Sequence, residues 1–259
     1  WVEDVIRGVA RLNATEGVRL VRGSHIVTKK LFDHDKSYFF QGEDGRIIFA
    51  IPYETDFTLI GTTDAEHEDV HQKPVATQEE QDYLCAFASQ YFEKPVTVDD
   101  VVWTYSGVRP LYDDGAKSAT AATRDYVLTL NSDGAPLLNI FGGKITTYRK
   151  LAEQVMAKLV PLIGGDGDWT AGVTLPGGDF TVAEKDRVIA DLKSDFPFLS
   201  DYWAKRLIQG YGTDARDILQ DAQSADDLGA DFGATLTEAE VGYLMAREYA
   251  HTAEDVVWR

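Results

Sequence analysis

A glycine-rich segment at residues 164–168, GGDGD, divides this 259-residue chain into two parts with different hydrophobic patterns. Before it, alternating apolar residues predict strands at 18–27, 38–41, 46–52 and 57–61. After it, apolar residues recur at helical spacing, roughly over 182–194, 202–210, 214–221 and 237–250. The sequence predicts an α+β fold: an antiparallel or mixed β-sheet domain with flanking helices, then an all-helical C-terminal domain.

Helices and further strands are also expected within the first part. Residues 2–11 predict a short helix, and Thr77 followed by Glu80 predicts a capping box ahead of a helix that contains Cys85. Residues 101–106 predict a strand, residues 126–140 a hairpin, and residues 146–162 an amphipathic helix. Thr181, Thr213 and Thr237 are expected to cap helices of the second part.

The charge and cysteine content exclude several classes of function. A net charge of −18 repels phosphate backbones, so we expect no nucleic acid partner. One cysteine, Cys85, allows no internal disulfide and no thiolate cluster, which favours a reducing compartment. The sequence has no apolar run long enough to cross a bilayer. Because the candidate site residues are mostly basic in so acidic a chain, they point to an anionic ligand.

Residues 141–149, FGGKITTYR, form the strongest local motif. Glycines let a backbone approach a ligand closely, and the unpaired amides at the start of a helix attract negative charge. Such a strand–Gly-Gly–helix junction suits a phosphate or the pyrimidine edge of a flavin, although a plain turn has the same pattern. Lys144 favours the anion site, because a lysine at a helix N-terminus gains nothing from the helix dipole.

Two further candidates are Arg109 and His25. Pro110 biases Arg109 toward extended geometry, so that its guanidinium can be held for a carboxylate or phosphate; the alternative is a surface salt bridge to Asp113 or Asp114. His25 follows a Gly-Ser pair on a predicted strand. A histidine is a fitting proton acceptor, but a structural role is the alternative.

Two patterns are interpreted as accidental. Residues 67–71 match H-E-x-x-H, but they precede Pro74 and have little to bury, so we expect an acidic solvated loop and no metal site. Residues 202–219 resemble a helix-turn-helix, but their aspartates would face the phosphates of DNA, which favours a plain packing pair of helices.

Several motifs in order resemble the FAD-dependent glycerol-3-phosphate dehydrogenases over essentially the whole chain. They are RLVRGSHIV (19–27), IGTTD (60–64), WTYSGVRPL (103–111), TRDYVL (123–128), FGGKITTYRKLAE (141–153) and LPGGDF (175–180). The resemblance implies that residues 1–24 end a flavin domain, 25–120 form an antiparallel substrate domain, 121–163 return to the flavin domain, and 170–259 form a helical domain. No G-x-G-x-x-G loop occurs, so we expect a fragment that lacks the N-terminal Rossmann unit, binds FAD weakly or not at all, and is inactive alone.

The resemblance also implies roles and partners. In such enzymes sn-glycerol 3-phosphate becomes dihydroxyacetone phosphate, hydride passes to FAD, and electrons pass to quinone; the intact enzyme would lie in the cytoplasm, peripheral to the membrane, as a possible homodimer. Arg109 and Arg124 would bind the phosphate or the developing oxyanion, with Lys144 as a further substrate contact, and His25 would be the base. Thr63 and Asp64 would help to shape the site. The flavin would be contacted by Gly142, Gly143, Lys144, Ile145 and Thr146. An oxygen-using glycerol-3-phosphate oxidase and a non-catalytic anion-binding or interaction module remain the alternatives.

Overall fold

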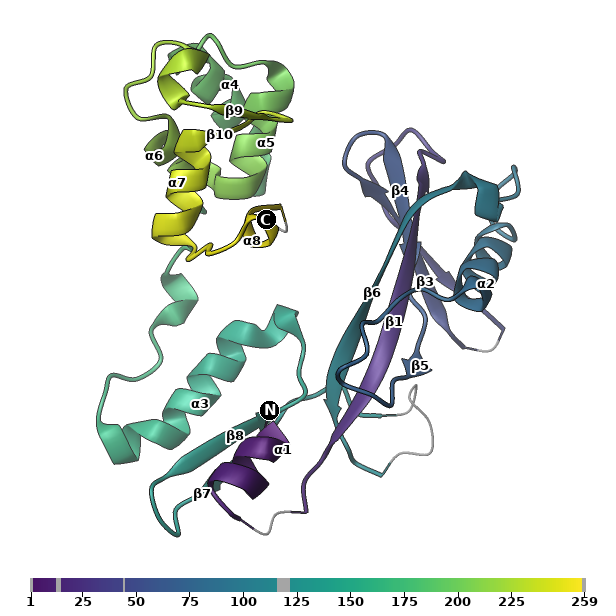
Figure 1. Cartoon of the computed structure of the whole chain (residues 1–259), viewed down its shortest axis with the longest axis vertical. Helices are drawn as coiled ribbons and strands as arrows, with labels where there is room; N and C mark the ends of the chain where they lie inside the picture. The colour runs from purple at the N-terminus through teal and green to yellow at the C-terminus, as the bar shows by residue number, and fades with distance from the viewer. Residues whose placement is uncertain (1, 13–14, 44, 116–121, 258–259) are drawn as a thin grey trace. The chain divides into compact units, whose positions relative to one another are not determined.

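The fold is that of a computed structural model, which describes residues 2–12, 15–43, 45–115 and 122–257. The chain forms two compact units that divide between Asp168 and Trp169 (Figure 1). This division falls in the gap between residues 163 and 170 that the sequence predicts between domains. The predicted α+β fold is confirmed, with antiparallel sheets in the first unit and a helical second unit. The assignment of segments to flavin and substrate domains stays a prediction.

The first unit is built on a six-stranded antiparallel sheet. Its strand order is β2-β3-β4-β1-β5, and β6 pairs with the other edge of β1. The strands are β1 (Val18–Lys29), β2 (Tyr38–Gln41), β3 (Ile47–Tyr53), β4 (Phe57–Gly61), β5 (Ala65–Glu66) and β6 (Val101–Tyr112). The predicted strands are thus present, and β6 is six residues longer than expected because it pairs with nearly all of β1. The long β1 strand therefore lies between β4 and β5 on one side and β6 on the other.

One face of this sheet is covered by α2 (Gln78–Ala88), which follows the predicted capping box. Thr77 Oγ1 accepts a hydrogen bond from the Glu80 amide, and the Glu80 carboxylate accepts one from the Thr77 amide. The core between helix and sheet is apolar and includes Ile26, Ile48, Ile60, Leu84 and Cys85. Burial raises the pKa of the Cys85 thiol to about 11, so this thiol is a packing residue. The short η2 turn (Val98–Asp100) then leads into β6.

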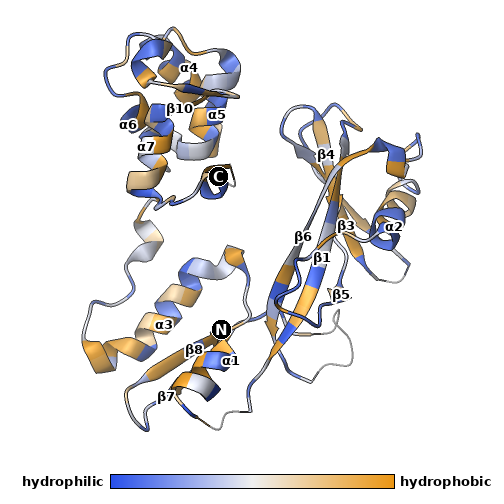
Figure 2. Cartoon of the chain, viewed as in Figure 1, coloured by the Kyte–Doolittle hydropathy of each residue, from blue (hydrophilic) through white to orange (hydrophobic). Residues whose placement is uncertain are grey.

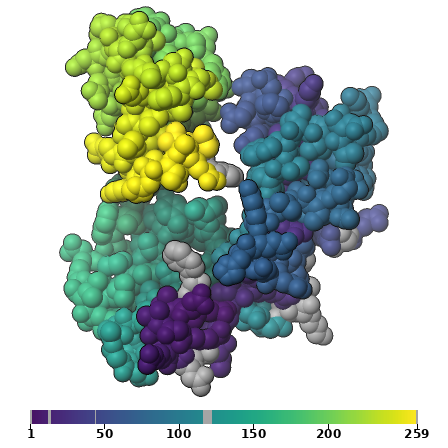
Figure 3. Space-filling model, viewed as in Figure 1, coloured from purple at the N-terminus to yellow at the C-terminus, as the bar shows by residue number. Residues whose placement is uncertain are grey.

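A second layer of the first unit holds the expected hairpin and the helix after it. They are β7 (Val127–Asn131), β8 (Leu137–Phe141), the 3₁₀ turn η4 (Ile145–Thr147) and α3 (Tyr148–Ile163). The N-terminal helix lies against this hairpin (Figure 3) as α1 (Val2–Asp4) and a π-helical turn η1 (Val5–Val9), so it is shorter and less regular than predicted. Apolar residues cover much of α3 (Figure 2), yet within this unit α3 buries only Glu153 among the residues described.

The second unit is helical and has its own core, to which Leu192, Leu207, Leu219 and Leu244 contribute. Its α-helices are α4 (Lys185–Asp195), α5 (Asp201–Tyr211), α6 (Ala215–Leu219), α7 (Glu238–Arg247) and α8 (Ala253–Val257). Its 3₁₀ turns are η5 (Thr170–Gly172), η6 (Val182–Glu184), η7 (Gly212–Asp214) and η8 (Ala225–Leu228).

Two details of this unit differ from the sequence prediction. A short antiparallel pair, β9 (Asp231–Gly233) and β10 (Leu236–Thr237), interrupts the helices; three-residue and two-residue strands are too short to leave a periodic signal. Thr237 caps α7 and Thr181 forms a capping box with Glu184, as predicted. Thr213 caps no helix, because it lies inside η7 and its hydroxyl donates to Asp179.

Within the described residues, no helix combines the length and apolar character needed to cross a membrane.

A buried ion pair fixes α5 against α7. The Glu240 carboxylate, 3% exposed, accepts two hydrogen bonds from the Arg206 guanidinium, at 2.7 and 2.6 Å, and a third from the Tyr211 hydroxyl at 2.7 Å. The bond to Glu240 raises the pKa of Arg206 against the effect of burial. Removing the carboxylate would remove all three of these hydrogen bonds and the counter-ion of Arg206, which would keep its two bonds to Thr235.

We therefore predict that Glu240→Ala lowers the unfolding free energy of the second unit by about 3 kcal/mol, since it breaks a buried pair from one side. Asp226→Ala, at an exposed position of the same unit, should change it by less than about 0.5 kcal/mol. Urea denaturation followed by circular dichroism measures both. Equal effects of the two substitutions would show that the ion pair does not stabilise the unit.

Candidate functional site

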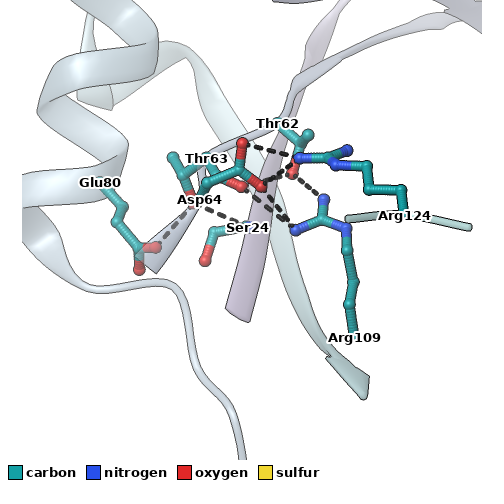
Figure 4. Close-up of polar contacts among 7 residues, drawn as sticks. All are labelled: Ser24, Thr62, Thr63, Asp64, Glu80, Arg109 and Arg124. Atoms are coloured by element: carbon teal, nitrogen blue, oxygen red, sulfur yellow. Dashed lines mark hydrogen bonds and ion pairs between the residues drawn. The ribbon is translucent and has the colours of Figure 1, made fainter. Parts of the chain in front are cut away.

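The site begins with a bulge at the edge of the sheet. β4 pairs with β1 up to His25–Gly61, and β5 resumes pairing with β1 at Arg22–Ala65. Between these pairs β1 contributes two residues and the neighbouring edge contributes three, Thr62, Thr63 and Asp64. One extra residue in a strand breaks the ladder locally and re-aims its side chains. The bulge directs the Asp64 carboxylate toward arginines from two other segments (Figure 4).

Arg109 reaches Asp64 from β6, on the opposite side of β1. Its Nη1 donates to Asp64 Oδ1 at 3.0 Å, and its Nη2 donates to Thr62 Oγ1 at 3.1 Å (Figure 4). The side chain crosses β1 at Gly23, where a Cβ would lie only 2.3 Å from Arg109 Nη2. The salt bridge to Asp113 or Asp114 considered from the sequence is thus wrong, because the partner is Asp64. Pro110 lies within β6 opposite Leu20, so Arg109 is extended as expected.

Arg124 approaches the same carboxylate from the loop before β7. Its Nη2 lies 3.0 Å from each of the two Asp64 oxygens (Figure 4). One carboxylate therefore faces two guanidinium groups, which leaves a net positive charge at this point of an acidic protein. Burial lowers the pKa of Arg109, the Asp64 carboxylate opposes this, and the like charge of Arg124 adds to it. The pair is thus electrostatically suited to a further anion.

His25 lies beside this pair on β1. Its ring stacks on Tyr105 with centroids 4.8 Å apart, and it packs so closely on Gly61 that a Cβ there would lie 2.1 Å from His25 Cδ2. Burial, and then the positive charge of Arg109, lower the pKa of His25 to about 4. Its Nδ1 is buried and has no hydrogen-bond partner among the described residues. His25 is therefore neutral at physiological pH and can accept a proton.

The Gly-Gly junction packs against the segment that follows Arg124 and against the end of β6. Gly142 and Gly143 have φ angles of 67° and 100°, which favour glycine. A Cβ on Gly142 would lie 3.1 Å from the Asp125 carbonyl oxygen, so the chain itself already requires glycine there. Lys144 and the following Ile145 and Thr146 are exposed at the start of η4. Among the described residues, Lys144 forms no hydrogen bond or ion pair with Arg109, Arg124 or Asp64, so the structure does not bring it to that pair.

A hollow of about 620 Å³ lies between the N-terminal helix and this junction, and Phe141 and Gly142 line it. Four carboxylates also line it, those of Glu3, Asp4, Glu68 and Asp69. An acidic wall repels a phosphate group. We therefore place the anion site at the arginine pair and not in this hollow.

The H-E-x-x-H segment forms no helix. Residues 67–71 follow β5 as coil and turn, so the one-turn spacing of His67 and His71 that zinc binding requires is absent. His67 is buried, not solvated as expected, and its Nε2 lies 3.1 Å from the Gln72 carbonyl oxygen. In the part of the chain that the structure describes, no cluster of three potential metal ligands occurs.

Of the four basic candidates, the structure brings Arg109, Arg124 and His25 together, and Thr63 and Asp64 join them. Sequence reasoning missed the roles of Gly23 and Gly61, which clear space for Arg109 and His25. It also identified Glu80 only as a capping residue, although Glu80 accepts a hydrogen bond from Thr63 Oγ1 at 2.7 Å (Figure 4). The capping box was the available signal, but nothing in the sequence joins it to residue 63.

Comparison with known proteins defines the class. Residues 1–149, more than half of the chain, match the family of FAD dependent oxidoreductases, and residues 168–259 match the C-terminal domain of alpha-glycerophosphate oxidase. The chain therefore belongs to the FAD dependent oxidoreductases.

Individual relatives agree with this assignment. The whole chain is 43% identical to 52% of D-erythritol 1-phosphate dehydrogenase of Brucella abortus. It is 41% identical to 52% of aerobic glycerol-3-phosphate dehydrogenase of Escherichia coli. It also superposes on 51% of the FAD-complexed glycerol-3-phosphate dehydrogenase of Bacillus halodurans with a TM-score of 0.74 and 26% identity. The chain thus spans about half the length of the relatives it matches.

The environment of His25 makes a specific titration prediction. NMR of the five histidines should show one imidazole with a pKa near 4, well below the ordinary 6.5, because it is buried beside Arg109. Between about pH 4 and 6.5 only the unfolded chain protonates this histidine, so its contribution to stability is lost as pH falls through that window. Arg109→Met should raise this pKa by removing a repelling charge. A pKa of 6.5 or above in the unchanged chain would contradict the burial argument.

Proposed function

We propose that this chain forms the substrate-binding surface of a FAD-dependent dehydrogenase that oxidises a secondary alcohol of a phosphorylated polyol, with sn-glycerol 3-phosphate as the first candidate. One observation carries the proposal: two partly buried arginines share a single carboxylate beside a neutral histidine. The arginines supply an unbalanced positive charge for a phosphate, and the imidazole supplies a proton acceptor. Family membership supports the redox chemistry, and the relatives' names support the substrate class.

Arg109 and Arg124 bind and orient the substrate in this account. Guanidinium groups bind phosphate or a developing oxyanion through paired, charge-assisted hydrogen bonds. Asp64 holds both groups in place before the substrate arrives, so that less side-chain entropy is lost on binding. Sharing one carboxylate leaves each guanidinium with further donors for the ligand.

His25 accepts the proton of the hydroxyl group that is oxidised. A pKa near 4 makes it a weak base in the free chain, partly because Arg109 repels the imidazolium. A phosphate dianion on Arg109 would offset that repulsion and raise the pKa of His25 toward the range useful for a general base. The O–H proton then moves to His25 as the C2–H bond breaks, and dihydroxyacetone phosphate forms.

Bound FAD supplies the two-electron acceptor for the hydride that leaves C2. The left-handed Gly142-Gly143 pair and the exposed start of η4 fit a flavin edge, because the first amides of a helical segment have no partner within it. Gly142, Gly143, Ile145 and Thr146 would contact the flavin there, and Lys144 would stabilise negative charge. The exposed apolar face of α3 supports the proposal that residues 121–163 belong to a flavin domain.

D-erythritol 1-phosphate is a second candidate substrate, favoured by the 43% identity to a dehydrogenase of that name. Both compounds carry a phosphate near a secondary alcohol, so the same arginine pair could bind either. Comparing kcat/KM of the full-length enzyme for the two compounds separates the candidates. A preference of tenfold or more, equivalent to about 1.4 kcal/mol, would assign the substrate.

The electron acceptor proposed for the intact enzyme is a quinone, with the protein in the cytoplasm and peripheral to the membrane, and a homodimer is possible. Oxygen is the alternative, and the match of residues 168–259 to a glycerophosphate oxidase domain keeps it open. Stoichiometric hydrogen peroxide during turnover would identify an oxidase. A non-catalytic anion-binding module is disfavoured by the convergence of Arg109, Arg124 and His25.

The first functional prediction concerns Arg109→Lys in the full-length enzyme. The substitution keeps the charge but loses the planar pair of donors, and a lost charge-assisted hydrogen bond costs roughly 1.5–3 kcal/mol. We expect kcat/KM for glycerol 3-phosphate to fall by about tenfold to a hundredfold, with KM and kcat both affected and the flavin content unchanged.

Arg19→Lys is the matched control, because Arg19 also lies on the sheet but pairs with the exposed Glu66. It should stay within about twofold of the unchanged enzyme. The role of Arg109 is refuted if Arg109→Lys also stays within twofold, or if its only effect is loss of FAD.

The second functional prediction concerns the chain by itself. It should bind FAD weakly or not at all and should not oxidise glycerol 3-phosphate, since its sequence has no G-x-G-x-x-G loop for the FAD pyrophosphate. The visible spectrum after gel filtration is the measurement. A stoichiometric yellow flavin that stays with the chain would overturn this expectation.

A further inference from the structure

We propose that Glu80 and Thr63 are positioning residues that hold the arginine-binding bulge from the opposite face of the sheet and thereby set affinity for the phosphorylated substrate. This inference rests on the proposed function. It concerns residues that need not touch substrate. Thr63 and Asp64 are neighbours in one bulge, but their side chains bond to groups from different elements (Figure 4).

Glu80 connects α2 to the bulge. Its Oε1 accepts a hydrogen bond from Thr63 Oγ1 at 2.7 Å. Its Oε2 accepts one from the Thr77 amide at 2.9 Å and forms an ion pair with Arg22 Nη2 at 3.1 Å. A capping box needs only the bond to Thr77. The Glu80 side chain is only 11% exposed, so its carboxylate bonds mainly to protein groups, Thr63 and Arg22 among them, and little to water.

Thr63 forms two hydrogen bonds to β1 at the point where the bulge interrupts the regular pairing of the strands. Its Oγ1 accepts a hydrogen bond from the Ser24 amide at 3.0 Å while its own amide donates to the Ser24 carbonyl at 3.3 Å. The hydroxyl donates its one proton to Glu80 and accepts from the Ser24 amide through a lone pair, so Thr63 joins α2 to β1. Removing the Thr63 hydroxyl leaves only the backbone bond from the Thr63 amide to the Ser24 carbonyl, and removing the Glu80 carboxylate leaves the hydroxyl without its anchor on α2. Either change weakens the hold on the residue that precedes Asp64.

The charge of Glu80 is maintained in this position. Burial opposes its ionisation, but hydrogen bonds from the Thr77 amide, Thr63 and Ser24, with the charge of Arg22, keep the pKa of Glu80 below its usual value. A neutral glutamine would have one acceptor oxygen for the two positions that the carboxylate now fills, and it would leave Arg22 without its ion pair. The bulge would then hold Asp64, and through it both arginines, less firmly.

The test uses the full-length holoenzyme with whichever of glycerol 3-phosphate and D-erythritol 1-phosphate it oxidises. Thr63→Val and Glu80→Gln should each raise KM about tenfold and lower kcat by less than about threefold, because they loosen the phosphate contacts without touching the reacting atoms. Thr63→Ser keeps the hydroxyl and should stay within about twofold. The double variant should be no worse than about the poorer single one, since both act on one bond.

Glu184→Gln is the matched control. Glu184 likewise accepts a hydrogen bond from the amide of the threonine three residues earlier, Thr181, and pairs with an arginine, Arg187, so its substitution tests loss of such a charge in the second unit. It should leave KM unchanged. Flavin content and melting temperature of all variants check for unfolding, and Thr63→Ser keeps the test decisive if Glu80→Gln is unstable.

The inference is overturned if the unchanged enzyme is active and Thr63→Val shows no rise in KM, or if Thr63→Ser is as impaired as Thr63→Val. Those results would leave the proposed function standing. Failure of the unchanged enzyme to oxidise either compound would instead refute the proposed function, and the inference with it.

Discussion

The site depends on one carboxylate held between two guanidinium groups. Asp64 lies 3.0 Å from nitrogens of both Arg109 and Arg124, and its side chain is 15% exposed. The two guanidinium groups repel each other, and the Asp64 carboxylate between them offsets that repulsion. The bulge in the β4–β5 edge places that carboxylate, and the rest of the site is arranged around it.

Two glycines make this arrangement sterically possible. Gly23 lets the Arg109 side chain cross β1, and Gly61 lets the His25 ring lie flat against the neighbouring strand. One face of the sheet therefore packs against α2. On the other face, Gly23 and Gly61 leave room for the side chains of Arg109 and His25. Its long strands β1 and β6 provide a rigid support for groups whose relative placement decides their chemistry.

The sequence allowed much of the fold to be predicted, because periodicity identifies long elements and capping boxes mark their starts. It could not give β9 and β10, which are too short to show a period. Arg109, Arg124, His25 and Asp64 were recognised through their motifs, but the pairing of both arginines with Asp64 was not. A bulge is a property of pairing between strands, and the reach of Arg109 across Gly23 is a property of register, so neither is visible in a local pattern.

The most direct test of the central claim is a crystal structure of the full-length enzyme with dihydroxyacetone phosphate bound. We expect ligand oxygens within hydrogen-bond distance of the guanidinium nitrogens of both Arg109 and Arg124, with Asp64 still paired to them and the C2 oxygen beside His25. A phosphate bound at another place, with both arginines still bonded only to the protein, would contradict it.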